Sequence, residues 1–390
     1  MAQTKSAKLT EVDVLIVGAG LAGLSALQAL RARAPQLRVA VLEAADFLGG
    51  TSRPAQTAIG EIDYGLKIFN DDARTHATLD FMESLLGQRI DRQRIEAAPV
   101  TYDDGRFKPY VGFGDSTVET ASEVEAYAQT ARLLLSSTPR DWIRQLIQNA
   151  GELVQTQSVV TRLQIDDGRV AEVTLNGAKV LRAENIIYTA APAALPVLFG
   201  EGHLAPRTRQ KLIKGEFWTS VNLDLIHAQP ITDSLAMHVL KGANEEPCVG
   251  FFAPPRAMED GRTLQLSQWM TLIHRDQVDE EELVAGALKQ IKRQIKRAYE
   301  SAIENLVQER ILVLPGSHGN LVGAFDEPAR LPKISNLWLT SALFAPEKNT
   351  VGCLAQVERI TQDLLGQSPR GSSLEAEAIA TEVQLATEPA

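Results

Sequence analysis

The chain has 390 residues, of which 44% are hydrophobic and 23% are charged, so it can bury more than one core and is not a disordered chain. Its 39 Lys and Arg residues against 49 Asp and Glu residues give a net charge of -10. That balance argues against nucleic acid and against a basic membrane-binding surface. The two cysteines lie far apart and the six histidines show no metal-binding spacing, so we expect neither a disulfide framework nor a metal site.

The first apolar stretch, residues 12–30, follows two lysines and resembles a signal peptide or a membrane-spanning helix in length. Asp13 and Gln28 interrupt it, and glycines divide it into a short strand at 12–17 and a helix at 21–34. We therefore expect no stable membrane insertion and a cytoplasmic protein.

The following elements indicate two kinds of sheet. A strand is predicted at 38–42, helices at 79–86, 118–136 and 141–153, a hairpin at 159–165 and 170–175, and a strand at 186–189. Alternating strands at 221–226, 236–240 and 264–272 favour an antiparallel sheet.

The last third of the chain is predicted to contain a charged helix at 279–301, strands at 311–314 and 337–340 that return to the first sheet, and a helix at 351–365. The acidic tail beyond residue 366 is expected to be disordered, with a transient helix around 374–385, and to be able to bind a protein partner.

Gly18, Gly20 and Gly23 form a GxGxxG motif between the first predicted strand and helix. The first glycine permits a tight turn, the second lets a diphosphate approach the backbone, and the third allows close packing of the helix. The free N–H groups of Leu21 and Ala22 at the helix start would bind the anion.

Glu43 ends the second strand 20 residues after Gly23, where an acidic residue binds a ribose diol. The sequence therefore predicts a dinucleotide cofactor, and a glycine-rich turn without a ligand is the alternative.

Gly49, Gly50 and Arg53 belong to the run LGGTSR at 48–53. This run resembles the second glycine motif of the FAD-dependent amine oxidase superfamily, which includes protoporphyrinogen oxidases, carotenoid-type desaturases and UDP-galactopyranose mutases. In those families the glycine pair leads the chain past the diphosphate and ribityl part of the cofactor. The resemblance implies non-covalently bound FAD rather than NAD, since no motif resembles a covalent attachment site.

Further segments extend the resemblance to about residue 365. The run DYGLKIF at 63–69 looks like the family's Gly-x-His-x-Phe loop beside the flavin ring, with Lys67 where several members have His. Val160 is similar to the valine whose backbone binds the adenine, and strands at 186–189 and 336–340 resemble strands of the same domain.

The chain also departs from the family pattern. Ser341 and Ala342 stand where the family has Gly-Asp or Gly-Glu, and Gln356-Val357 replaces a later Ser-Gly. Thr350 and Gly352, at the expected start of the last helix, would still stabilise negative charge at the flavin N1–C2=O edge. Loss of one carboxylate weakens FAD binding, so a protein without the cofactor is an alternative.

Lys67 and His318 are the two further candidates. An ammonium at Lys67 would raise the reduction potential of a neighbouring flavin, or a desolvated Lys67 would act as a base; the alternative is a surface lysine. His318 lies in a Gly-rich loop that could face the active site.

The predicted architecture is α/β, with a Rossmann-like FAD-binding domain from 1–72, 151–200 and 305–366. A second, α+β substrate domain with an antiparallel sheet would come from 73–150 and 201–304, and 367–390 would form the tail.

The predicted function is that of an FAD-dependent oxidoreductase that transfers hydride from a C–N or C–C centre of a small organic substrate to flavin N5. A non-redox sugar-nucleotide mutase and a catalytically degenerate partner subunit are the alternatives. Aromatic residues make up only 5% of the chain, which disfavours the aromatic substrate cage of amine oxidases in particular.

Overall fold

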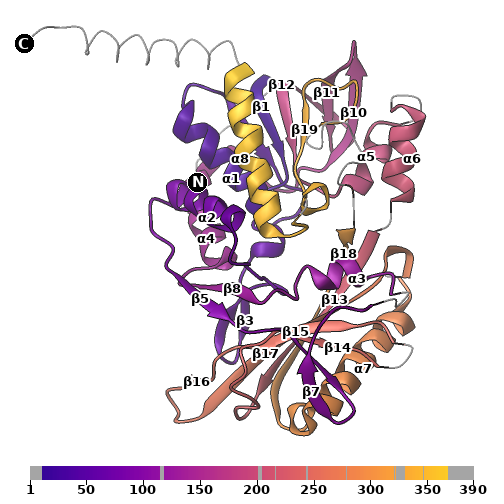
Figure 1. Ribbon diagram of the computed structural model, residues 1–390. Coiled ribbons are helices and arrows are strands. Elements are labelled where there is room, and N and C mark those ends of the chain that lie inside the picture. Colours follow the sequence, from indigo (N-terminus) through magenta and orange to yellow (C-terminus); the bar gives the residue numbers. More distant parts are fainter. Residues whose placement is uncertain are drawn as a thin grey trace, which may run out of the picture.

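The computed structural model describes residues 11–114, 118–200, 204–215, 217–242, 245–277, 279–319, 321, 330–345 and 347–367. Figure 1 shows two large sheets, one in the upper and one in the lower part of the molecule, each covered by helices. The predicted α/β class with a second, largely antiparallel sheet is confirmed. The acidic tail, its transient helix and its proposed partner lie outside the described residues.

The first sheet is built around β1 (Glu11–Val17), which is parallel to both of its neighbours. Its strand order is β10-β11-β12-β1-β2-β9, and β19 also pairs with β12. The bounds are β2 (Val39–Leu42), β9 (Val154–Gln155), β10 (Val160–Asp166), β11 (Arg169–Leu175), β12 (Lys179–Tyr188) and β19 (Leu337–Leu339). Parallel strands are buried on both faces, which explains the apolar runs that predicted β1 and β2.

Alternate residues of β1 point into two different cores because successive side chains of a strand face opposite ways. Val14 and Ile16 pack against four helices, and Leu15 and Val17 face the opposite core with α5 and α6. The four helices are α1 (Leu21–Arg33), α2 (Ala73–Leu86), α4 (Pro139–Ala150) and α8 (Thr350–Gln367). The opposite face carries α5 (Leu195–Leu198) and α6 (Pro206–Lys214).

Helices α2 and α4 pack in the core of the first sheet. Both lie within 73–150, which we assigned to the substrate domain, yet Met82 and Trp142 are buried in the same core as α1 and β1. Helical periodicity shows that a helix has an apolar face but not which sheet that face covers. The domain boundaries themselves stay a prediction.

The second sheet has the strand order β18-β13-β17-β15-β14-β6-β7, and β16 also pairs with β17 (Figure 1). The bounds are β6 (Val100–Asp103), β7 (Arg106–Pro109), β13 (Phe217–His227), β14 (His238–Leu240), β15 (Cys248–Phe252), β16 (Arg256–Ala257), β17 (Thr263–His274) and β18 (Leu306–Gly319). One face packs on α7 (Glu281–Ala298) through Ile291 and Ile295. The other face, with Trp218 and Met270, contacts Leu66.

Two predicted segments differ in the structure. The strand expected at 311–314 was wrongly placed in the first sheet, because β18 pairs along its length with β13 of the second. A short apolar run carries no signal of the sheet that it joins. The helix expected at 118–136 is instead α3 (Ala121–Glu125) followed by β8 (Ala131–Leu135), which pairs with β5 (Arg92–Glu96).

The remaining elements are short. A two-stranded sheet is formed by β3 (Ala55–Thr57) and β4 (Gly60–Ile62). The single-turn helices are η1 (Gly50–Ser52), η2 (Gly151–Leu153), η3 (Pro192–Ala194), η4 (Arg275–Gln277), η5 (Glu300–Ile303) and η6 (Ala342–Phe344). Within the described ranges, no helix combines the length and apolarity needed to span a bilayer. The same ranges hold no cluster of three or more side chains suited to a metal ion.

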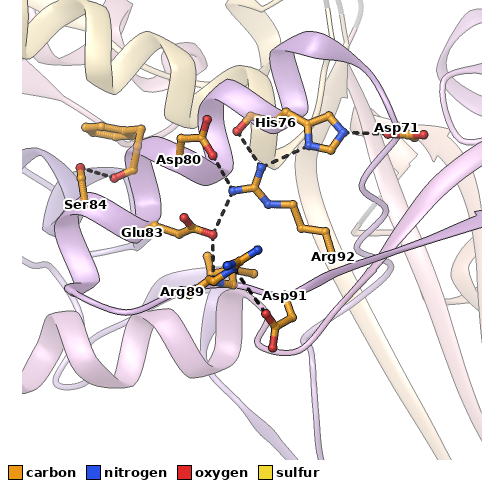
Figure 2. A network of polar contacts seen from close by, with 10 residues as sticks. Asp71, His76, Asp80, Glu83, Ser84, Arg89, Asp91 and Arg92 are labelled. Atoms are coloured by element: carbon orange, nitrogen blue, oxygen red, sulfur yellow. Dashed lines mark hydrogen bonds and ion pairs between the residues drawn. The ribbon is translucent and has the colours of Figure 1, made fainter.

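A polar network fixes β5 to α2, as Figure 2 shows. Arg92 Nη2 of β5 donates to Asp80 Oδ1 at 2.6 Å and to Glu83 Oε1 at 2.9 Å, and Arg92 Nη1 donates to the His76 carbonyl at 3.3 Å. His76 Nε2 in turn lies 2.7 Å from Asp71 Oδ1. The network therefore anchors the end of the segment 63–71, which leads from the β3–β4 hairpin to α2.

Candidate cofactor and substrate site

A cavity of about 520 Å³ lies between the two sheets, at the carboxyl ends of β1, β2 and β12. Val17, Leu42 and Tyr188 line it from the first sheet, and Asn222 and Met270 line it from the second. Ligands of open α/β sheets bind at this edge, where the loops after parallel strands meet. The position of the cavity therefore makes it the candidate site.

The β1–α1 turn forms one wall, and its three glycines have different roles. Gly18 has a φ of +106° and lines the cavity. Gly20 also lines it and has no atom within 4 Å of the position of a Cβ. Gly23 does not line it, and a Cβ there would lie 1.9 Å from the Gly18 carbonyl oxygen. The turn thus leaves open space beside Gly20 and is closely packed at Gly23.

The N-terminus of α1 reaches the cavity through Leu21 and Ala22. No side chain caps this helix, and its first turn holds no acidic residue. Its free N–H groups and helix dipole therefore favour a negatively charged ligand next to Gly20.

Glu43 follows β2 and lines the cavity close to the same turn. Its Oε2 accepts a hydrogen bond from the Ala19 N–H at 2.8 Å, and its Oε1 accepts one from the Ala45 N–H at 2.9 Å. Each oxygen keeps a second lone pair, so the fixed carboxylate can still accept bonds from two hydroxyl groups.

The second glycine pair supports the first turn. Gly49 donates its N–H to the Ala19 carbonyl at 2.9 Å, and Gly50 lines the cavity beside Gly20. Gly49 itself does not line it. Arg53 also lies outside the lining: its guanidinium carbon stands 4.3 Å from the Phe47 ring centre, and its Nη2 donates to Tyr64 Oη at 3.1 Å.

Val160 lines the cavity on the side of Glu43, together with Ser158 and Val159, and the Ser158 N–H donates to the Glu43 carbonyl at 2.8 Å. It begins β10 and pairs with Leu175. The residues predicted to bind adenine, ribose and diphosphate therefore surround one continuous space.

Lys67 lies at the other end, on the segment between β4 and α2. Its Nζ forms no hydrogen bond or ion pair with any residue that the structure describes. Burial lowers the pKa of Lys67, and the nearby Asp63 carboxyl acts in the opposite direction. The structure places Lys67, partly buried, in the cavity wall.

The start of α8 lies near Lys67, and only one of its two predicted residues lines the cavity. Thr350 and Cys353 line the cavity, whereas Gly352 does not. A Cβ at Gly352 would lie 2.4 Å from the Ala345 Cβ, so this glycine allows the chain before α8 to pack closely.

The residues that depart from the family pattern contact each other. Ser341 and Ala342 line the cavity at the end of β19, and the Ser341 N–H donates to Gln356 Oε1 at 3.2 Å. Gln356, which stands in place of the family's serine, thus holds the backbone next to Ala342, which stands in place of the family's Asp or Glu.

The second sheet supplies a wall that the motifs did not reveal. Besides His318, which we expected to face the site, the lining includes four residues that the sequence analysis missed: Tyr127, Ser220, Asn222 and Ser317. Buried polar side chains at alternate positions of β13 were the available signal, because a strand core normally holds apolar residues. Lys348, which contacts the buried Glu123, completes this end.

The comparisons with known proteins agree with this geometry. The NAD(P)-binding Rossmann-like domain family matches residues 16–85. Over 117 residues the chain is 32% identical to hydroxyneurosporene desaturase of Rhodobacter capsulatus, a match that spans 30% of this chain and only 22% of the desaturase.

Two solved oxidases have similar structures over most of this chain. Cyclohexylamine oxidase from Brevibacterium oxydans IH-35A gives a TM-score of 0.65 at 14% identity and covers 93% of this chain and 99% of its own. A putative protoporphyrinogen oxidase from Exiguobacterium sp. 255-15 gives 0.65 at 15% identity and covers 91% and 99%.

Putrescine oxidase bound to putrescine gives a TM-score of 0.61 at 15% identity and covers 92% of this chain and 99% of its own. The fold and the cavity thus define a two-sheet protein with a Rossmann-like domain. The chain has the fold of these oxidases, which is the fold that the sequence resemblance predicted.

Proposed function

We propose that this protein is an FAD-dependent oxidoreductase that takes hydride from a C–N or C–C centre of a small organic substrate. The observation that carries the proposal is Gly20, which leaves open space beside the uncapped N-terminus of α1 in the wall of a cavity of about 520 Å³. Bound FAD would supply the hydride acceptor, its N5 atom.

The residues of this chain would hold the cofactor along the cavity. The α1 N-terminus would bind the diphosphate, Glu43 the ribose hydroxyls, and the backbone at Val160 the adenine. Thr350 at the start of α8 would face the flavin carbonyl edge, where the helix dipole favours negative charge. Burial raises the pKa of the Cys353 thiol, which supports non-covalent binding because the protonated thiol is a poor nucleophile.

Purified protein incubated with FAD and freed of excess ligand is expected to retain an absorbance band at about 450 nm, a property of oxidised flavins. Anaerobic mixing with matched amines and alcohols should then bleach that band with at least one compound. A yellow protein that no compound reduces but that isomerises a sugar nucleotide would favour the mutase. A colourless protein after FAD treatment would contradict the proposal and favour the degenerate partner.

Lys67 provides a test of the end of the cavity where the flavin ring would lie. We expect Lys67→Met to lower the flavin midpoint potential and to slow flavin reduction on the order of a hundredfold, because it removes the cation that faces the cavity there. The potential is measured by equilibration with redox dyes and the rate by stopped flow. Lys179→Met, an exposed lysine of β12, is the matched control. An unchanged potential and an unchanged rate in Lys67→Met would show that Lys67 has no role in the reaction.

A further inference from the structure

A row of uncharged polar side chains lines the cavity on the side of the second sheet. This polar wall consists of Tyr127, which follows α3, Ser220 and Asn222 of β13, and Ser317 and His318 of β18. The cofactor-binding groups proposed above come from other segments, so the polar wall is left for the substrate.

A strand irregularity brings two of these residues to the same side. Successive residues of a regular strand point to opposite faces, yet Ser317 and His318 both line the cavity. The register between β13 and β18 shifts between Trp218 and Ser220, opposite this point, and Gly316 has a φ of +58°. Bulges of this kind turn side chains toward functional sites.

The hydrogen bonds of the wall have a consistent direction. Asn222 Nδ2 donates to Ser220 Oγ at 3.0 Å, and Ser317 Oγ donates to the same oxygen at 2.9 Å. His318 Nδ1 lies 2.9 Å from Ser317 Oγ. Because the Ser317 proton is directed to Ser220, Nδ1 is the donor in that contact.

The direction of these hydrogen bonds determines whether Tyr127 presents a donor or an acceptor to the cavity. With its proton on Nδ1, the neutral His318 ring accepts at Nε2, which lies 2.8 Å from Tyr127 Oη. The Tyr127 hydroxyl donates its only proton there, and its oxygen presents lone pairs to a ligand. Burial, together with the charges of Lys67 and Lys348, lowers the pKa of His318 to about 4, so the ring is neutral near pH 7.

The lysines and the acceptor oxygen of Tyr127 together disfavour ionic ligands at the wall. Among the described residues of the lining, only Glu43, Lys67 and Lys348 carry charge, and Glu43 belongs to the β1–α1 end. A cationic ligand at Tyr127 would approach the ammonium groups of Lys67 and Lys348, while the nearby Glu123 carboxylate lies behind the lining and is paired with Lys348. A carboxylate would meet the lone pairs of Tyr127.

We propose that Tyr127 binds the substrate by accepting a hydrogen bond from an uncharged donor, a hydroxyl or a neutral N–H, and that His318 positions Tyr127 for this contact. The inference rests on the proposed function and names the substrate class of the same site. Ammonium substrates, by contrast, are expected to bind this wall less tightly.

The test uses three probes with one carbon skeleton: benzyl alcohol, benzylamine and benzoate, which are neutral, cationic and anionic near neutral pH. Isothermal titration calorimetry on the FAD-treated full chain registers binding whether or not a flavin responds. We expect benzyl alcohol to bind at least about tenfold more tightly than either ion, and Tyr127→Phe to weaken that binding about tenfold. Tyr110→Phe is the matched control, since Tyr110 lies outside the lining and contacts Glu125.

His318 is tested by a double-mutant cycle. If His318 acts through Tyr127, His318→Ala should weaken benzyl alcohol binding only while Tyr127 is present, and the double variant should match Tyr127→Phe. A structural role alone would give additive losses. Circular dichroism and thermal unfolding of each variant identify any that fail to fold, and Ser317→Ala replaces His318→Ala in that case because it removes the acceptor of Nδ1.

The proposal is overturned if benzylamine or benzoate binds as tightly as benzyl alcohol, if no probe binds, if Tyr127→Phe behaves as Tyr110→Phe does, or if the cycle is additive. Failure of the proposed function has a different signature, namely protein that stays colourless after FAD treatment. Calorimetry still measures probe binding to the polar wall in that protein, so the two failures are distinguished.

Discussion

Gly20→Ala is expected to lower the affinity for FAD at least about tenfold while leaving the fold intact. Gly20 has a φ of -79° and a ψ of -173°, a conformation that alanine adopts without strain. Its methyl group meets no protein atom within 4 Å and stands in the space where a diphosphate would approach the backbone. The melting temperature of the protein without FAD should therefore stay the same or rise slightly, because alanine restricts the unfolded chain.

Gly23→Ala is the matched control because it gives the opposite result. Its Cβ would lie 1.9 Å from the Gly18 carbonyl oxygen, a backbone atom that cannot move without displacing the turn. We expect this variant to lose roughly 1–3 kcal/mol or more of stability, as overpacked cores do. FAD affinity is measured by quenching of flavin fluorescence and stability by thermal unfolding. Unchanged FAD affinity in Gly20→Ala would place the cofactor elsewhere or nowhere.

Acid is expected to destabilise the second sheet through His227 and His238. Both rings are buried beside Phe252, and His227 Nε2 contacts Ser267 Oγ at 2.8 Å while His238 Nε2 contacts Tyr299 Oη at 2.7 Å. Burial lowers the pKa of each ring from 6.5 to about 4. Between these values the unfolded chain binds more protons than the folded chain, so stability falls as the pH falls.

The size of the effect follows from the proton linkage. At about pH 5, each of the two histidines lowers the free energy of unfolding by about 2 kcal/mol relative to its value above about pH 7. Urea unfolding at several pH values measures this slope. His238→Gln, which cannot titrate, should reduce the acid loss by about 2 kcal/mol. His274→Gln, at a half-exposed side chain of β17, is the comparison variant. An unchanged slope in His238→Gln would contradict the prediction.

The parts of the site that could be predicted are those encoded within a short stretch of chain. The strand, turn and helix around Gly18 and Gly20 form from neighbouring residues, and Glu43 follows at the spacing of one βαβ unit. The structure therefore places these residues together as expected. Arg53 and Gly352 fall outside the lining because Tyr64 and Ala345 occupy the positions next to them, which no local pattern reveals.

The parts that could not be predicted depend on contacts between distant segments. Tyr127 and His318 are 191 residues apart, and only the pairing of β18 with β13 brings His318 to the cavity. The apolar residues of α2 fit a helix on either sheet equally well, so their place beside α1 is decided by tertiary packing.

The two backbone hydrogen bonds to Glu43 have a thermodynamic consequence. A free glutamate loses on the order of 1–2 kcal/mol of side-chain rotamer entropy when a ligand immobilises it. The Ala19 and Ala45 N–H groups already fix this carboxylate before any ligand arrives. Glu43 is thus preorganised, and a diol that reaches it meets an acceptor whose ordering was completed when the chain folded.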